Sequence, residues 1–158
     1  MINCPFCNPR VIEMQFIDNL YFYAIYNHSP ILPGHSLIIP KNHVERFGDL
    51  QTELSSALFP FTQKVMSVLQ QAFNVADFDL TIQDGAKAGQ TIPHLHLHVI
   101  PRYINDLPNP GDWYPIFRKH ENNELIDSFN RPKIPIEKLN EITSYLKETA
   151  SIIFNSKQ

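Results

Sequence analysis

The sequence lacks any uninterrupted apolar run of about 18 residues, and its first residues lack the charged start and apolar run of a signal peptide. We therefore expect no membrane contact and a cytosolic protein. An excess of one charge is also missing, because 13 Lys and Arg against 16 Asp and Glu give a formal net charge of −3. This balance gives no electrostatic basis for binding long nucleic acid, and a small anionic ligand would need a local cluster of donors.

Cysteine is scarce, and both cysteines lie in Cys4-Pro5-Phe6-Cys7. Thiols three residues apart make a poor structural disulfide, which favours a reducing compartment. The pair fits a redox motif, half of a zinc site, or chance. A redox pair is expected at the start of a helix that follows a strand, whereas this pair lies at the extreme N-terminus. A zinc site would need two further ligands.

The order of expected elements predicts a single α+β domain over residues 1–158, with a mainly antiparallel sheet. Residues 1–102 would form its core, 103–135 a loop-rich segment and 136–155 a C-terminal helix. Stretches rich in β-branched and aromatic residues, or alternating apolar with polar ones, predict the strands. The expected strands are residues 11–16, 20–26, 36–39, 78–82 and 95–100.

One long helix is expected over residues 54–73, where apolar residues recur at steps of three and four and form one stripe. Thr52 is the expected N-cap. Pro60 lacks a backbone N–H and predicts a kink in this helix or a late start.

The segment His94-Leu95-His96-Leu97-His98 places three of the seven histidines at alternate positions. On a strand, side chains two residues apart share a face at a spacing of about 7 Å, so the three imidazoles would line one surface. Folding does not require this, because threonine, lysine or glutamate serves a solvent-facing strand better. The pattern therefore indicates function.

Two kinds of chemistry fit three imidazoles on one face. Neutral imidazole is a common zinc ligand, and a metal hydrolase with zinc on all three histidines would want a nearby carboxylate. The nearest candidates are Asp79 and Asp84, which would have to reach across the sheet. Alternatively, one histidine attacks a substrate while its neighbours orient it and assist the leaving group.

The flanking residues resemble one enzyme family. The histidines follow Ala88-Gly89-Gln90-Thr91 and precede Pro101-Arg102, and upstream lie Asn27-His28-Ser29-Pro30, Gly34-His35 and His43-Val44-Glu45-Arg46-Phe47. Together they resemble the histidine-triad hydrolases, and most of all the fragile-histidine branch of dinucleoside polyphosphate hydrolases, over residues 21–102. The resemblance implies a histidine-triad fold whose five-stranded sheet is extended across a homodimer.

The resemblance also implies roles for individual residues. His96 would attack the α-phosphorus to form a nucleotidyl-histidine intermediate that water then hydrolyses, and His98 would contact the phosphate and the departing oxygen. The implied substrate-binding residues are Asn27, His35, Gln83, Gln90, Thr91 and His98. With no glycine-rich phosphate loop and its lysine, phosphate binding rests on histidines and neutral donors. The family needs no organic cofactor and no catalytic metal, and Mg²⁺ would only accompany the polyphosphate substrate.

The cysteine pair departs from the fragile-histidine branch, which typically lacks it. Some relatives, including the distantly related uridylyltransferases, hold a structural zinc ion with such a pair, one upstream histidine and the first histidine of the triad. Mapped onto this sequence, the zinc ligands are Cys4, Cys7, His43 and His94. His28 is the competing third ligand, and a metal-free N-terminal tail is the alternative.

The resulting prediction is a hydrolase that splits a dinucleoside polyphosphate and releases AMP. A nucleoside phosphoramidase or adenylyl-conjugate hydrolase shares the intermediate but differs in the leaving group, and a phosphorylase would replace water by phosphate. A nucleotide-binding sensor with slow turnover is the alternative from another class, since the same residues serve binding and turnover.

Overall fold

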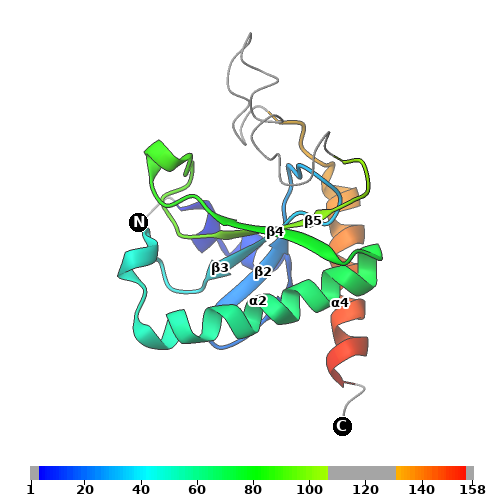
Figure 1. Ribbon diagram of the computed structural model, residues 1–158, viewed down its shortest axis with the longest axis horizontal. Helices are drawn as coiled ribbons and strands as arrows, with labels where there is room; N and C mark the ends of the chain where they lie inside the picture. Colours follow the sequence, from blue (N-terminus) through cyan, green and yellow to red (C-terminus); the bar gives the residue numbers. More distant parts are fainter. Residues whose placement is uncertain (1–3, 107–130, 156–158) are drawn as a thin grey trace.

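The computed structural model describes residues 4–106 and 131–155, which form a five-stranded sheet with helices on both faces (Figure 1). The strands are β1 (Gln15–Asp18), β2 (Phe22–Tyr26), β3 (Ser36–Pro40), β4 (Asp77–Ile82) and β5 (Leu97–Arg102). The α-helices are α1 (Pro9–Ile12), α2 (Thr52–Phe73) and α4 (Ile136–Asn155), and the short 3-10 turns are η1 (Pro5–Cys7), η2 (Phe47–Asp49) and η3 (Ala86–Ala88). Within the described ranges, none of the helices is long and apolar enough to span a bilayer.

The strand order across the sheet is β1-β2-β3-β5-β4, and every neighbouring pair is antiparallel. This confirms the α+β class and the five-stranded antiparallel sheet. Strands β3 and β5 are central neighbours although some 60 residues separate them in sequence, with Leu37 opposite His98. The β3–β5 pairing therefore brings residues from the first third of the chain beside the histidine segment.

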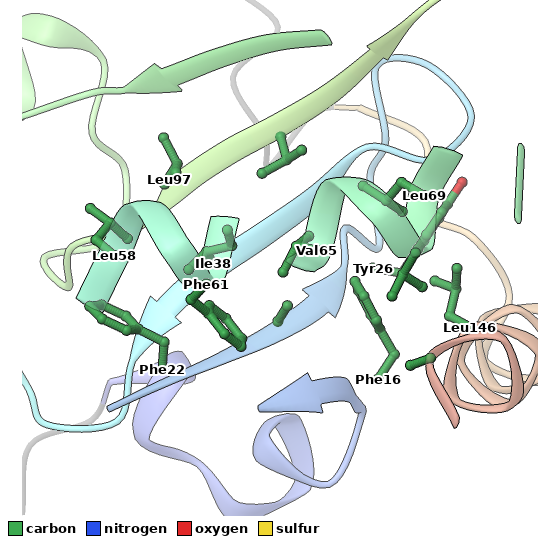
Figure 2. Packing of buried hydrophobic residues seen from close by; sticks show 14 of the residues in the cluster. Phe16, Phe22, Tyr26, Ile38, Leu58, Phe61, Val65, Leu69, Leu97 and Leu146 are labelled. Carbon is green, nitrogen blue, oxygen red and sulfur yellow. The ribbon is translucent and has the colours of Figure 1, made fainter. Parts of the chain in front are cut away.

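One face of the sheet, called here the helix-covered face, packs against α2 and α4 (Figures 1 and 2). The apolar stripe of α2 lies against alternate residues of the strands, with the Phe61 ring stacked on Phe22 at 6.0 Å between centroids. Figure 2 labels ten members of this core: Phe16, Phe22, Tyr26, Ile38, Leu58, Phe61, Val65, Leu69, Leu97 and Leu146. Burial of this apolar surface is the main stabilising contribution to the fold.

The opposite face, called here the histidine face, carries the intervening residues of the same strands. Tyr23 and Ile25 of β2 and Leu37 and Ile39 of β3 form a smaller cluster with Cys4 and Phe6 from the N-terminal segment. Successive strand side chains point to opposite faces, so His98 of β5 lies on this face while Leu97 and Val99 lie in the helix-covered core.

The prediction of a strand over residues 11–16 is partly wrong. Val11 and Ile12 belong to α1, and the strand begins only at Gln15. Asn8 caps this helix, its side chain accepting a hydrogen bond from the Arg10 N–H at 3.0 Å, and Pro9 occupies the first helical turn. An Asn-Pro start is a helix signal, which outweighs the β-branched residues that follow.

The long helix is confirmed, but its expected N-cap is wrong. Gln51 rather than Thr52 is the N-cap, and its side chain makes no capping hydrogen bond. The helix does not start late, because it runs from Thr52 through Pro60. Both Pro60 and Ser56, whose carbonyl loses its helical partner, are exposed, so water can satisfy that carbonyl.

The C-terminal helix lies where it was expected, as α4. Of the predicted loop-rich segment, residues 107–130 lie outside the described residues, and residues 103–106 and 131–135 contain neither helix nor strand. The division into a core and two C-terminal parts within one domain stays a prediction.

Candidate functional site

A strand was expected over residues 95–100, with the three histidines on one of its faces. In the structure the three histidines do not all lie on a regular strand. Strand β5 begins at Leu97, so His98 is the member of the triad within it. His94 and His96 lie in an irregular lead-in, where the Leu95 N–H donates to the Val44 carbonyl at 2.6 Å instead of to a strand neighbour. The ring of His94 faces the N-terminal segment, with its Nδ1 3.3 Å from Sγ of Cys4.

His96 is held by the backbone of its own segment. Its Nδ1–H donates to the carbonyl of His94 at 2.8 Å, which leaves the lone pair on Nε2. The ring touches that of His98 at 4.9 Å and that of Phe6 at 5.2 Å between centroids. Burial lowers the pKa of His96, although the hydrogen bond to the His94 carbonyl opposes this effect. The imidazole is therefore neutral at pH 7, the state in which Nε2 can act as a nucleophile.

His35 and His98 form a hydrogen-bonded pair with defined tautomers. The Ile31 N–H donates to Nδ1 of His35 at 3.1 Å, so the proton of His35 lies on Nε2. That Nε2–H donates to Nδ1 of His98 at 2.9 Å, which places the proton of His98 on its own Nε2. Nε2 of His98 is buried and has no hydrogen-bond partner among the described residues, so it is a donor available to a ligand.

Electrostatics keep this pair neutral. Burial is the main cause that lowers the pKa of His98 to about 3, and His96 and Arg131 lower it further. The pKa of His35 is lowered by burial, then by His98 and Arg131. A neutral pair preserves the directed sequence of hydrogen bonds from Ile31 to His98.

Gly34 positions His35 immediately before β3. It has a φ of +84°, a conformation that favours glycine, and a Cβ there would lie 2.6 Å from Cγ of Pro101. A larger residue at this position would therefore displace the backbone beside His35.

The histidines open onto a cavity of about 350 Å³ on the histidine face. Its apolar wall is formed by Pro5, Phe6, Val11, Ile25, Leu37 and Ile92. Its polar wall is formed by Asn27, His28, Gln83, Gln90, Thr91, His96, His98 and Arg131. The cavity therefore combines a hydrophobic half with a half rich in hydrogen-bonding groups, as ligand sites commonly do.

The structure places five of the six predicted substrate-binding residues at this cavity: Asn27, Gln83, Gln90, Thr91 and His98. His35 is fully buried behind His98 and does not line the cavity. Gln90 is already engaged, since its Oε1 accepts from the Gly85 N–H at 2.8 Å and its Nε2 donates to the Glu45 carbonyl at 3.0 Å. Its side chain therefore ties the η3 loop to the segment after β3.

The four predicted metal ligands are brought together at the other end of the histidine segment. The ligand atoms of Cys4, Cys7, His43 and His94 all lie within 4.8 Å of one another. Sγ of Cys4 is 3.3 Å from Nδ1 of His94, and Sγ of Cys7 is 3.4 Å from Nδ1 of His43. In a tetrahedral zinc site, ligand sulfur and nitrogen atoms are about 3.5 Å apart, so this group fits such an ion.

The second ring nitrogens of both histidines have partners that suit metal binding. Nε2 of His94 donates to the Pro40 carbonyl at 2.9 Å, which directs the lone pair of Nδ1 towards the thiols. Nε2 of His43 lies 3.7 Å from the Glu45 carboxylate. Oxygen acceptors of this kind orient metal-bound histidines and raise their basicity. The competing ligand, His28, lines the cavity instead.

The two carboxylates considered for a catalytic metal have other partners. Asp79 pairs with Arg102, and Asp84 pairs with Arg46 at 3.1 Å while accepting from the Phe47 N–H. Among the residues that the structure describes, the group suited to a metal ion is Cys4, Cys7, His43 and His94. The geometry thus gives no support to zinc on all three histidines of the triad.

Sequence reasoning missed three contributors to the site. Phe6, between the two cysteines, places its ring 5.8 Å from that of His94 and 5.2 Å from that of His96. Glu45 was recognised only as part of a motif, without a role. Arg131 lies at the cavity although it is more than 30 residues from the triad in sequence, and only the mixed charge of its segment hinted at it.

Comparison with known proteins places this geometry in a family. The model of the HIT domain matches residues 11–105. A protein of Arabidopsis thaliana, named bifunctional bis(5′-adenosyl)-triphosphatase/adenylylsulfatase FHIT, is 42% identical over 92 residues, which cover 58% of this chain and 51% of that protein. A bis(5′-nucleosyl)-tetraphosphatase (asymmetrical) of Schizosaccharomyces pombe is 41% identical over 100 residues, covering 63% and 55%. The chain thus spans about half the length of these two relatives.

Among solved structures, the diadenosine triphosphate hydrolase of Plasmodium falciparum superposes with a TM-score of 0.68 at 29% identity, covering 91% of this chain and 78% of that one. The family match covers more than half of the chain and includes all three histidines of the triad. The chain therefore belongs to the HIT-domain family.

Proposed function

We propose that this protein hydrolyses dinucleoside polyphosphates through a nucleotidyl-histidine intermediate, releasing AMP. The observation that carries the proposal is the pairing of two complementary groups at the cavity: Nε2 of His96 bears a lone pair, and Nε2 of the adjacent His98 bears a proton. A nucleophile beside a hydrogen-bond donor is the arrangement that phosphoryl transfer needs. The relatives named as triphosphatase and tetraphosphatase support the same reaction.

In the first step, Nε2 of His96 attacks the α-phosphorus. A P–N bond forms, the P–O bond to the leaving nucleotide breaks, and its electron pair goes to the departing oxygen. The Nε2–H of His98 donates a hydrogen bond to that oxygen, which stabilises its developing charge. The attacking imidazole becomes positive and keeps its Nδ1–H, whose hydrogen bond to the His94 carbonyl stabilises that charge.

In the second step, water attacks the same phosphorus. A P–O bond forms, the P–N bond breaks and its electron pair returns to Nε2 of His96, while the proton of the water passes to solvent. The enzyme regains its starting state, and AMP leaves. The chemistry needs no organic cofactor, and any Mg²⁺ enters with the polyphosphate.

The remaining cavity residues bind the substrate in this proposal. The apolar wall suits an adenine ring, Asn27 the ribose and Thr91 the phosphate chain, whereas the Gln90 side chain is already hydrogen-bonded and holds the η3 loop in place. Gln83 lies on the leaving-group side. His35 acts as a positioning residue, because it touches His98 and not the cavity.

The decisive test is single-turnover reaction of diadenosine triphosphate with wild type and His96→Gly. Mass spectrometry of the acid-free quenched wild type should show protein carrying one adenylyl group, and His96→Gly should carry none and turn over at least about 10⁴-fold more slowly. Added imidazole should partly restore cleavage by His96→Gly, because it can enter the space left by the ring. Turnover by His96→Gly at the wild-type rate would overturn the mechanism. Tight binding of substrate with negligible turnover by the wild-type protein would indicate a sensor.

Hydrolysis of an adenylyl conjugate is the second candidate, since the Arabidopsis relative is also named adenylylsulfatase. The intermediate is the same and sulfate replaces a nucleotide as leaving group. Comparing kcat/KM for adenylyl sulfate, adenosine phosphoramidate and diadenosine polyphosphates ranks these substrates. Products formed in phosphate buffer would reveal phosphorolysis, which releases ADP in place of AMP.

We also propose that the four-ligand group binds a structural zinc ion. Two thiols and two imidazoles are typical zinc ligands, and both imidazoles present Nδ1 to the thiols. The ion would attach the N-terminal segment to the sheet, and with it Pro5 and Phe6 of the cavity wall. His94 would then bind the metal through its side chain, while its backbone carbonyl accepts the hydrogen bond from His96.

Metal analysis tests this assignment directly. The purified wild type should contain about one zinc ion per chain, and Cys4→Ser should contain far less. The matched control is Ser29→Ala, a similarly buried hydroxyl away from the metal group, which should retain zinc. Zinc-free wild type, or Cys4→Ser with full zinc content, would contradict the proposal.

A homodimer is proposed from family resemblance together with the sheet order. Strand β4 is an edge strand whose Leu80 is 44% exposed, so a second copy could extend the sheet there. Light scattering after size exclusion should give twice the chain mass for wild type. It should give the monomer mass for a β4 variant such as Leu80→Lys.

A further inference from the structure

Arg131 precedes α4 and lies at the same cavity as the catalytic histidines. The described residues that line this cavity are otherwise apolar, amide, hydroxyl or histidine side chains, and none is a carboxylate. No other described lining residue is a lysine, arginine, aspartate or glutamate, so Arg131 is the one permanently charged side chain among them.

Arg131 lines the same cavity as His98. Burial is the main cause that lowers the pKa of His98 and of His35, and the charge of Arg131 lowers both further, so the guanidinium acts on the His35–His98 pair. Its Nε and one terminal nitrogen are buried. Arg131 therefore shares the cavity wall with the His98 donor, and none of the four proposed metal ligands lines that cavity.

The chain around Arg131 is attached to the same edge of the cavity. The Ile134 N–H donates to the His28 carbonyl at 2.8 Å. Ile134 lies three residues after Arg131, and His28 directly follows Asn27. This backbone contact fixes the approach of the segment to the cavity wall. The chain that carries Arg131 is thereby held beside His28, which also lines the cavity.

A polyphosphate substrate brings several negative charges into this site. The His96 end supplies an attacking nitrogen, and the donors near it suit the single α-phosphate. The phosphates beyond the scissile bond would lie on the His98 side. A guanidinium binds phosphate oxygens through two parallel hydrogen bonds and keeps its charge at every physiological pH.

We propose that Arg131 binds the phosphates beyond the scissile bond and so selects leaving groups that carry several negative charges. This inference rests on the proposed function, because it assigns the part of the substrate that Arg131 contacts. It makes Arg131 a specificity-determining residue supplied by the segment before α4, outside the 11–105 range of the family match.

The test compares two substrates with the same adenylyl group. Diadenosine triphosphate has ADP as its leaving group, and the p-nitrophenyl ester of AMP has a leaving group without phosphate. Arg131→Gln should lower kcat/KM for diadenosine triphosphate about 10- to 100-fold, as expected for loss of a hydrogen bond to a charged group, and change that for the ester less than about twofold. Arg131→Lys should recover part of the loss.

The matched control is Lys133→Gln. Lys133 lies two residues after Arg131 and carries the same charge, but its side chain is exposed and does not line the cavity. It should keep both activities. Equal losses on both substrates in Arg131→Gln would show a merely structural role, and no loss on either would exclude phosphate contact. Either result would overturn the inference. The proposed function would remain intact as long as the wild type hydrolyses diadenosine triphosphate.

A binding experiment separates the inference from turnover. Calorimetry with a methylene-bridged diadenosine triphosphate and with AMP measures the added affinity that the extra phosphates provide. That added affinity should fall at least tenfold in Arg131→Gln and stay unchanged in Lys133→Gln. If wild type binds the analogue in this way but does not cleave diadenosine triphosphate, the proposed function fails and the assignment of Arg131 stands. Equal added affinity in wild type and Arg131→Gln would overturn the assignment.

Discussion

The helix-covered face of the sheet is closed by two long helices, whereas the histidine face is covered in part by the short N-terminal segment of η1 and α1. The first face buries a continuous apolar core from α2, α4 and alternate strand residues. The second buries a small apolar cluster beside histidines and thiols whose polar atoms are held by specific hydrogen bonds. The same strands therefore separate two tasks, with stability arising mainly on one face and the proposed chemistry on the other.

Truncation in the helix-covered core tests this separation with the largest expected effect on stability. Phe61→Ala removes a 1% exposed ring that stacks on Phe22, and should lower the free energy of unfolding by about 3–5 kcal/mol. Urea denaturation measures the loss, and KM of the folded fraction should stay unchanged because Phe61 is on the face opposite the cavity. Phe59→Ala, a neighbour on α2 that is 68% exposed, is the matched control and should change stability little.

Acidification should act through the histidine face. Unfolding restores the ordinary pKa of His98, 6.5, from about 3 in the folded state, so below pH 6.5 the unfolded chain binds a proton that the folded chain does not. Stability is therefore complete above pH 6.5 and declines as the pH falls towards 3, by about 2 kcal/mol at pH 5 for this group. Denaturation of wild type and His98→Asn between pH 7 and pH 5 measures this, and the variant should show the weaker pH dependence. Identical pH dependence would contradict the buried, neutral state of His98.

Loss of the hydrogen bond behind His98 should have a smaller and more selective effect. His35→Leu leaves Nδ1 of His98 without its donor and frees the tautomer, so kcat should fall about tenfold while KM changes little. His35→Asn, which keeps a side-chain donor, should recover part of kcat. Steady-state kinetics separates the two constants. A rise in KM without a change in kcat would instead mean that His35 contacts substrate directly.

The helix-covered face was largely predictable from sequence, since it depends on periodic patterns. The apolar stripe of α2 and the alternation in β4 each follow from local residues. The errors on this face lie at element ends, such as Gln51 in place of Thr52, where one residue of offset changes the cap.

The histidine face was predictable in its membership and not in its geometry. The resemblance predicted that Cys4 and His94, 90 residues apart, share a metal site, and the structure places Sγ of Cys4 3.3 Å from Nδ1 of His94. By contrast, the irregular path of His94 and His96 depends on a hydrogen bond from Leu95 to Val44, which no local pattern encodes. Arg131 lines the cavity because of the tertiary fold, and no sequence motif predicted its position there.

The smallest prediction concerns the cap of α2, where the helix-covered face can gain stability without affecting the histidine face. Gln51 has the extended backbone of an N-cap, with φ of −63° and ψ of 152°, but its side chain makes no capping hydrogen bond. Gln51→Asp places an acceptor within reach of the free N–H groups and a negative charge at the positive end of the helix, so stability should rise by about 1 kcal/mol. Thermal unfolding measures the gain, with Gln51→Ala as the control that removes the side chain without supplying an acceptor. If the two faces are independent as argued, kcat/KM of Gln51→Asp equals that of wild type; a change in activity would show that the position of α2 is transmitted through the sheet to the histidines.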